Sequence, residues 1–250
     1  MSASGIRFAR LVLIAILIAA WEIYGRAFAN SSYFAPPSQV LLVLWPKVLG
    51  DPRVRFAVEL ALLEVVAAFV LSIVAGVVIG VLIGLTDLGR RAFYPLILLL
   101  YAIPQVIMIP LFMLGFGIGP AGKIAFGFSH GIFPIIVNTV AGMRNVNPAL
   151  VRGTEALGAS RIAVIRYVIL PHMVTTLFAS MRLAMTMTLL GVILAELFVS
   201  TAGIGYFTQL FAESFSPAPL FALIGTLAVM AIILNELVRL AETRFTRWKD

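Results

Sequence analysis

Four long runs without a single charged side chain dominate this sequence. They cover residues 65–86, 92–122, 124–143 and 214–235, with 22, 31, 20 and 22 residues. A helix of roughly 20 apolar residues crosses the hydrocarbon core of a bilayer, so each run is long enough to span one. Alternating ten-residue strands, the pattern of a membrane barrel, do not appear. The chain is therefore predicted to be an all-α polytopic membrane protein.

We expect a single transmembrane domain over residues 1–250, with six membrane helices joined by short segments. The expected helices cover about 8–28, 58–86, 92–114, 121–143, 172–199 and 217–240. The first is interpreted as an uncleaved helix rather than a signal peptide, because no small-residue cleavage site follows it. The chain has no cysteine, which excludes disulfides and thiolate metal sites and leaves the redox compartment undetermined.

The distribution of Lys and Arg predicts the orientation of the chain in the membrane, because cytoplasmic segments carry an excess of cations. With the N-terminus inside, twelve cations fall in inner segments and five in outer ones, and Arg182 lies within a helix. Both termini are therefore expected in the cytoplasm. The net charge of +7 is interpreted as a topology signal, and nucleic-acid binding is not predicted.

Three local patterns predict structure around the second and third helices. Residues 34–38 (FAPPS) suggest an extended turn that leads into a short interfacial helix near 40–45. A ridge of three glycines spaced by four predicts close approach of another helix; these are Gly76, Gly80 and Gly84. Three prolines in the segment 92–114 predict a bent helix, which fits either a substrate pathway or packing alone; these are Pro95, Pro104 and Pro110.

Two sequence motifs match catalytic or nucleotide-binding patterns only superficially. Residues 117–124 read GIGPAGKI, but Ile124 occupies the place where a phosphate-binding loop needs Ser or Thr. Residues 127–131 read GFSHG, but Ser129 lies in an apolar helical run rather than at a strand-to-helix turn. An intramembrane protease with His172 as base is the corresponding alternative. We favour a tight turn and a packed helix.

The loop 144–171 interrupts the apolar runs with a short basic segment of defined local structure. Asn147 and Pro148 predict a helix start, as cap and first helical residue, for a helix over 148–157. Gly158 predicts the left-handed stop of that helix. Ser160 predicts the cap of a second helix over 161–170 that closes before Pro171. Apolar residues on this loop, namely Leu150, Leu157 and Ile162, indicate insertion into a groove on another protein.

This segment resembles the EAA loop of the permease subunits of binding-protein-dependent ABC importers. Gly158, Val168, Leu170 and Pro171 stand at the spacing of the second half of that family's pattern. The first half departs from it, since residues 152–154 read Arg-Gly-Thr where the family has Glu-Ala-Ala, and Glu155 follows one place later.

The resemblance extends over nearly the whole chain, in fragments that look like the nitrate/sulfonate/taurine branch of the family. These fragments are FAPPSQV at 34–40, Pro104 with IPLF at 109–112, FGIG at 116–119, Phe133-Pro134 with Asn138, RLA at 182–184, Ala195-Glu196, and GIGY at 203–206.

The resemblance implies a type I ABC importer permease of the bacterial cytoplasmic (inner) membrane without catalysis of its own. Its implied partners are cytoplasmic ABC ATPase subunits, an extracytoplasmic substrate-binding protein, a second permease copy, most simply an identical one, and membrane lipid. ATP and magnesium would be bound by the partner ATPase and no cofactor by this chain. The implied substrate is a small anion of the sulfonate, taurine or nitrate type, with other organic solutes left open.

The resemblance also assigns roles to particular residues. The helix 148–157 would be the coupling helix, and the residues expected to contact the ATPase are Leu150, Glu155, Ala156, Leu157, Gly158, Ala159, Ser160 and Arg161. Ionisable and polar residues inside membrane helices mark pathways, and the pathway candidates are Asn138, Arg182, Met185, Met187 and Glu196. Arg182 and Glu196 lie on one expected helix at a separation of roughly 21 Å, so they cannot pair within one chain.

An ion-coupled secondary transporter is the principal alternative function. Such a protein would carry buried carboxylates midway through its helices and usually a repeated half. Glu59 and Glu64 lie near one end of a helix, and no internal repeat is visible. Retention of a soluble ATPase by the purified protein would distinguish the importer subunit from this alternative.

Overall fold

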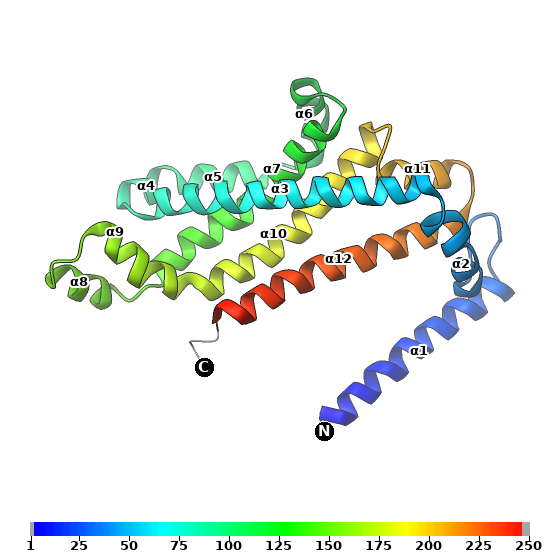
Figure 1. Ribbon diagram of the computed structural model, residues 1–250, viewed down its shortest axis with the longest axis horizontal. Helices are drawn as coiled ribbons and strands as arrows, with labels where there is room; N and C mark the ends of the chain where they lie inside the picture. The colour runs from blue at the N-terminus through cyan, green and yellow to red at the C-terminus, as the bar shows by residue number, and fades with distance from the viewer. Residues whose placement is uncertain (1–2, 247–250) are drawn as a thin grey trace. The chain divides into compact units, whose positions relative to one another are not determined.

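A computed structural model describes residues 3–246 of the chain, and within that range every regular element is a helix (Figure 1). The α-helices are α1 (Ala3–Ala27), α2 (Pro37–Val43), α3 (Pro52–Gly84), α4 (Asp87–Ala92), α5 (Tyr94–Ala102), α6 (Ile109–Phe116), α7 (Pro120–Arg144), α8 (Pro148–Ala156), α9 (Arg161–Val164), α10 (Leu170–Val199), α11 (Ile204–Glu213) and α12 (Pro217–Thr246). The all-α fold class is confirmed. Three short segments of other helical types are η1 (Leu44–Leu49), η2 (Gln105–Met108) and η3 (Ile165–Ile169).

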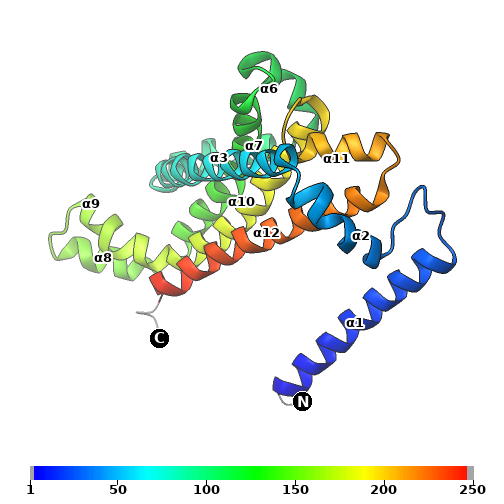
Figure 2. The same cartoon turned by 45° about the vertical axis from the view of Figure 1, so that its right-hand side comes forward.

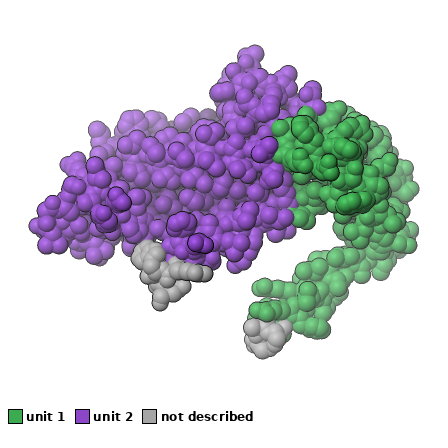
Figure 3. Space-filling view, viewed as in Figure 1, with its two compact units in different colours: residues 1–60, 202–229 green, residues 61–201, 230–250 purple. Residues whose placement is uncertain are grey.

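The described residues form two compact units, shown in different colours in Figure 3. Unit 1 contains residues 3–60 and 202–229, and unit 2 contains residues 61–201 and 230–246. The second and last long helices, α3 and α12, each contribute one part to unit 1 and the rest to unit 2. All charged clusters discussed below lie within unit 2.

In unit 1, α1 is hydrogen-bonded to the loop that follows it and to the first turn of α2. The indole Nε1 of Trp21 donates to the Ala35 carbonyl at 3.1 Å, and the Glu22 carboxylate accepts from the backbone and hydroxyl of Ser38. The edge of Trp21 also packs on Phe221 of α12, with ring centroids 5.7 Å apart. The expected short helix after the extended turn is present as α2 and η1. No sequence pattern predicted α11.

The core of unit 2 is built on α7, which packs against α10 along much of its length (Figures 1 and 2). The α3 segment packs on α7 through the predicted glycine ridge. A Cβ placed on Gly76 would lie 2.8 Å from Ile135, and one placed on Gly80 would lie 2.6 Å from Thr139. A Cβ on Gly84 would collide with Met143 in the same way. The prediction that this ridge admits another helix is confirmed, and α7 is that helix.

The predicted bend in the segment 92–114 is confirmed, and it is sharp enough to divide the segment into α5, η2 and α6. The two halves are bent by 84° at the break (Figure 2 shows α6 turned away from the bundle). Ile103 has extended backbone, with φ −65° and ψ 130°, as the restriction before Pro104 favours. Pro104 also lacks the donor that would continue the helical hydrogen bonds. The prolines therefore bend this segment, as predicted, at Pro104.

The predicted closure of a helix before Pro171 is wrong. The helix runs on, so that Arg161–Val199 forms one continuous span of 39 residues. Just before the proline the chain widens into the π-helical segment η3, where the Leu170 amide donates to the Ile165 carbonyl five residues back. A π-turn at this place gives the proline ring the space that a regular helix denies it.

Four described helices are long and apolar enough to cross a membrane, or five if the bent pair counts as one span. They are α3, α7, the span 161–199 and α12, with α4–α6 as the bent pair. The expected first helix is present as α1, but it is not among these spans, so the predicted count of six is not reached by this criterion. The multi-pass helical architecture is confirmed.

Candidate functional site: the α8–α9 loop and two charged clusters

The segment after α7 folds as predicted up to the start of its second helix: a short capped helix, α8, ends at a glycine joint and is followed by the capped start of α9, which runs on into α10. The Asn147 side chain caps α8 by accepting from the Ala149 amide at 2.9 Å, with Pro148 in the first turn. Gly158 has φ +85°, and its amide donates to the Glu155 carbonyl at 2.9 Å. The Ser160 hydroxyl caps α9 by accepting from the Ala163 amide at 3.3 Å. Sequence rules for helix ends therefore predicted this loop well.

The α8–α9 loop exposes the apolar side chains that a partner would cover. Leu157 is 90% exposed, Ile162 77% and Leu150 53%, and no residue of α8 is buried. Of the other expected contact residues, Glu155, Ala156, Gly158, Ser160 and Arg161 are also exposed, and Ala159 is half-buried. Helices shorter than about 12–15 residues are marginal in water. A nine-residue helix with no buried face therefore depends on its caps and on a partner.

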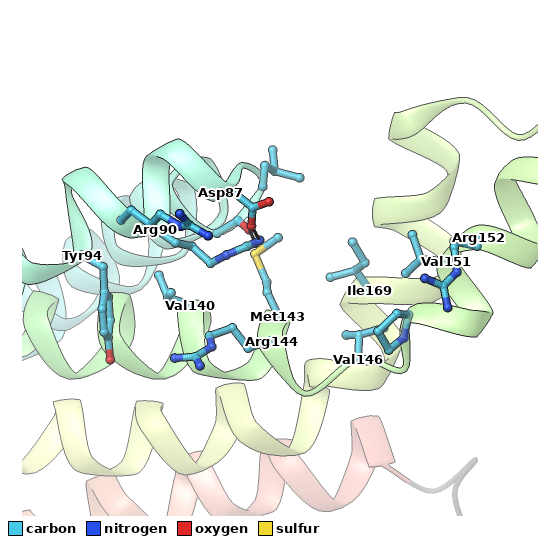
Figure 4. A pocket seen from close by; sticks show the side chains of 14 residues that line it. Asp87, Arg90, Tyr94, Val140, Met143, Arg144, Val146, Val151, Arg152 and Ile169 are labelled. Carbon is cyan, nitrogen blue, oxygen red and sulfur yellow. Dashed lines mark hydrogen bonds and ion pairs between the residues drawn. The ribbon is translucent and has the colours of Figure 1, made fainter.

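Beside this loop lies a cavity of about 680 Å³, here called the arginine-lined hollow (Figure 4). Its charged lining residues are Asp87, Arg90, Arg91, Arg144 and Arg152, which come from α4, α7 and α8. Its apolar lining includes Leu85, Val140, Met143, Val146, Val151 and Ile169. Arg90 forms an ion pair with Asp87 and donates to the Gly84 carbonyl. The hollow thus combines a strongly basic and an apolar character.

The second charged cluster is buried, at the opposite end of α7. Lys123 Nζ lies 3.0 Å from Glu64 Oε1 on α3 and 3.3 Å from Glu196 Oε1 on α10. All three side chains are at least 98% buried. Removing one partner of a buried ion pair destabilises the fold strongly, because the remaining charge is left uncompensated in an apolar interior. We name these three residues the buried charge cluster.

No sequence pattern predicted the buried charge cluster, although Glu196 was among the pathway candidates. Lys123 was noted within a rejected nucleotide-loop pattern, and Glu64 as a carboxylate near a helix end. Neither observation connects residues that are 59 and 73 positions apart. The sequence does contain one indication of the cluster, because each of its three charged residues interrupts or borders a long apolar segment.

The pathway candidates are not brought together at one place. Arg182 pairs with Glu242 of α12, whereas Glu196 belongs to the buried charge cluster, as their predicted separation on one helix requires. The Asn138 amide donates to the Pro134 carbonyl of its own helix at 2.8 Å. Met185 is buried and Met187 is half-buried on α10.

The residues of the rejected motifs have other structural roles. Lys123, from the GIGPAGKI stretch, is held by two carboxylates at the start of α7. Ser129 donates to the Phe126 carbonyl at 2.7 Å and lies 3.3 Å from Gln105, and His130 Nδ1 is 3.1 Å from the same carbonyl. Within residues 3–246, no group of three or more His, Cys, Asp or Glu side chains is placed to hold a metal ion.

Apolar spans, a glycine-packed core and an exposed pair of capped helices define a polytopic membrane protein with a surface suited to a partner. Residues 72–247 match the family described as "Binding-protein-dependent transport system inner membrane component". The chain belongs to this family, since the match covers more than half of its length. It is a multi-pass inner-membrane permease subunit of an ABC importer, of the nitrate/sulfonate/taurine branch.

Three curated relatives show the branch. The chain is 26% identical to the taurine transport system permease protein TauC of Escherichia coli, over 94% of this chain and 87% of the relative. It is 27% identical to the putative aliphatic sulfonates transport permease protein SsuC of Bacillus subtilis, over 96% and 87%. It is 24% identical to the nitrate import permease protein NrtB of Leptolyngbya laminosa, over 92% and 84%.

The fold matches a solved ABC transporter structure. A chain of the MetNI methionine ABC transporter in an inward-facing conformation superposes with a TM-score of 0.65 at 21% identity. The match covers 78% of this chain and 94% of that chain. This likeness supports the type I permease fold. The family assignment also favours the importer subunit over the ion-coupled secondary transporter.

Proposed function

We propose that the α8–α9 loop couples this permease to an ATPase subunit by inserting into a groove on that subunit. The observation that carries the proposal is a capped helix pair with Leu157 90% exposed and no buried residue in α8. Leu150, Glu155 and Arg161 would contact the groove together with residues 156–160. ATP and magnesium would be bound by the ATPase, and this chain would have no catalytic activity.

We further propose that both chain ends and the α8–α9 loop face the cytoplasm. The excess of cations in the segments assigned to that side supports this orientation. The arginine-lined hollow and the coupling loop then lie on the same inner side. The buried charge cluster lies toward the outer side, where a binding protein would deliver the solute.

Two copies of the chain would enclose the substrate passage, as the family resemblance implies. Asn138, Met185 and Met187 remain candidates for its lining, with Arg182 and Glu196 nearer its two ends. Nucleotide-driven closure of the ATPases would tilt α7 and α10 through the loop that joins them, which is a two-state coupling.

The proposed substrate is a small anion of the sulfonate, taurine or nitrate type. The relatives named for taurine, sulfonates and nitrate support this class. Lys123, the one buried cation among residues 5–246, is already paired with two carboxylates. Selectivity would therefore be determined mainly by the binding protein. A binding assay on that protein with taurine, an alkanesulfonate and nitrate measures this selectivity. Binding of none of these solutes would contradict the proposed substrate class.

Two experiments test the coupling and the orientation. Affinity purification of the permease in detergent, after co-expression with its ATPase, should retain the ATPase in stoichiometric amount. Because the chain has no cysteine, a single Leu157→Cys substitution can be labelled with an impermeant thiol reagent. In cells without the ATPase, we expect labelling only after the cells are opened, whereas Ser32→Cys should be labelled in intact cells. Labelling of Leu157→Cys from outside would overturn the proposal.

A further inference from the structure

We propose that the arginine-lined hollow binds the phosphate group of an acidic phospholipid. The inference rests on the hollow's charge, on its position at the ends of two membrane helices, and on its mixed lining. It requires neither ATPase docking nor a particular substrate.

The charge of the hollow is not balanced within the described chain. Of its four arginines, Arg90 is paired with Asp87. The other three, Arg91, Arg144 and Arg152, have no ion-pair partner among residues 3–246 and are exposed. The lining therefore carries a net charge of +3, from four arginines and one aspartate. Guanidinium groups bind phosphate oxygens through paired, charge-assisted hydrogen bonds, so the missing counter-ion is best supplied by a phosphate.

The position of the hollow places it at the membrane boundary. It is lined by the last residue of α3, Gly84, and the last residue of α7, Arg144. Arg144 is 21 residues from Lys123 along α7, or roughly 31 Å. This distance matches the roughly 30 Å thickness of the hydrocarbon core. The hollow thus lies at the depth of the lipid headgroups, where basic pockets between membrane helices bind acidic lipid.

The lining distinguishes a lipid headgroup from a free phosphate ion. Arg90 and Asp87 lie on the α4 side and Arg152 on the α8 side, with Val140 and Met143 of α7 beside them (Figure 4). Apolar side chains contribute nothing to a small hydrated ion. They suit the glycerol and first methylene groups that accompany a lipid phosphate, and a cavity of about 680 Å³ has room for both. The acidic phospholipid is therefore the occupant that uses the whole lining.

Native mass spectrometry of the purified full-length chain tests the proposal. The chain would be titrated with phosphatidylglycerol, with zwitterionic phosphatidylethanolamine, and with inorganic phosphate as competitor. We expect at least about fivefold tighter binding of phosphatidylglycerol. An arginine near the surface contributes about a fivefold factor in affinity for acidic lipid, so the double variant Arg91→Gln/Arg144→Gln should lose about 25-fold. Arg91→Lys/Arg144→Lys should restore part of that loss.

Arg244→Gln is the matched control, because Arg244 is an exposed arginine of α12 outside the hollow. It should leave phosphatidylglycerol binding unchanged. Equal binding of the two lipids, or equal loss in Arg244→Gln and the double variant, would overturn the proposal. Displacement of the bound lipid by equimolar inorganic phosphate would assign the hollow to the free ion and would also overturn it. A failure of ATPase co-purification would leave these results unaffected, so the two proposals fail separately.

Discussion

Basic side chains lie at both ends of α7, but they are buried and paired at one end and exposed at the other. At one end, Lys123 is buried and lies within 3.3 Å of two carboxylates. At the other end, Arg144 and Arg152 are exposed beside a hollow with a single, already paired aspartate. A charge closed off from water needs a partner in the same chain. A charge in water needs none and remains available to a partner molecule.

Residues at the Lys123 end of α7 stabilise the fold, whereas residues at the Arg144 end are available to bind other molecules. The buried charge cluster joins α3, α7 and α10 within unit 2, and its energy is internal to the chain. The arginine-lined hollow and the α8–α9 loop leave basic and apolar groups without partners among residues 3–246. We therefore expect substitutions at the Lys123 end of α7 to change stability, and substitutions at the Arg144 end to change binding or transport.

The largest effect is expected from Lys123→Met, which leaves two buried carboxylates without their ammonium partner. Breaking a buried ion pair by removing one partner costs about 3–5 kcal/mol, so most of the protein should fail to fold or unfold early. The yield of monodisperse protein in detergent and its thermal unfolding midpoint measure this. Lys47→Met, at an exposed lysine of η1, is the control. The triple variant Lys123→Met/Glu64→Gln/Glu196→Gln should recover much of the loss, and no recovery would argue against the charge explanation.

A smaller loss is expected from Gly80→Val, which tests the helix packing that connects the two ends. A Cβ at this position would lie 2.6 Å from Thr139 of α7, so α3 and α7 must separate. Overpacking of this kind costs about 1–3 kcal/mol, measured as a lower unfolding midpoint. Gly115→Val on α6 is the control, because nothing lies within 4 Å of a Cβ there. Equal stability of the two variants would show that the ridge does not limit the approach of α7.

Gly158→Val should abolish transport while costing little global stability. The backbone of Gly158 has φ +85°, a conformation that costs an L-residue roughly 1–2 kcal/mol. The strain falls on an exposed joint, so membrane insertion should remain normal and ATPase docking should weaken. Substrate uptake and ATPase retention measure the effect. Gly153→Val, in the middle of α8 and with open space around it, should retain more activity, and unchanged uptake by Gly158→Val would contradict a rigid joint.

The smallest effect on stability is expected from Arg152→Gln, which removes the same charge as Lys123→Met from the other end of the comparison. Substitutions at exposed positions without internal partners usually change stability by no more than about 0.5 kcal/mol. The unfolding midpoint should therefore stay close to that of the wild type. A fall in the unfolding midpoint as large as that of Lys123→Met would show that the charge at the exposed end of α7 also stabilises the fold.

Local rules predicted the parts of the structure that depend on local sequence. Asn147, Pro148, Gly158 and Ser160 fix the ends of α8 and α9 through their own hydrogen bonds and backbone preferences, so neighbouring residues sufficed. The long apolar runs likewise predicted α3, α7 and α12 to within a few residues at most ends. Glycines spaced by four predicted a close helix contact, because that spacing places them on one face.

The features that the sequence did not predict depend on how the helices pack in three dimensions. Pro104 and Pro171 have the same local chemistry, yet one accompanies an 84° break and the other lies within a continuous span. The difference comes from η3, whose wider turn accommodates Pro171, and no local rule predicts it. The buried charge cluster was missed because its three residues meet only after three helices have packed.

The central claim is that the α8–α9 loop is seated in the ATPase, and cysteine cross-linking tests it most directly. Leu157→Cys in the cysteine-free chain would be combined with single cysteines across the ATPase surface, with Leu114→Cys, 86% exposed on α6, as the control. We predict efficient cross-links from position 157 to one confined patch of the ATPase and none from position 114. Cross-links from neither position, or equally from both, in a complex that still hydrolyses ATP and transports would contradict the account.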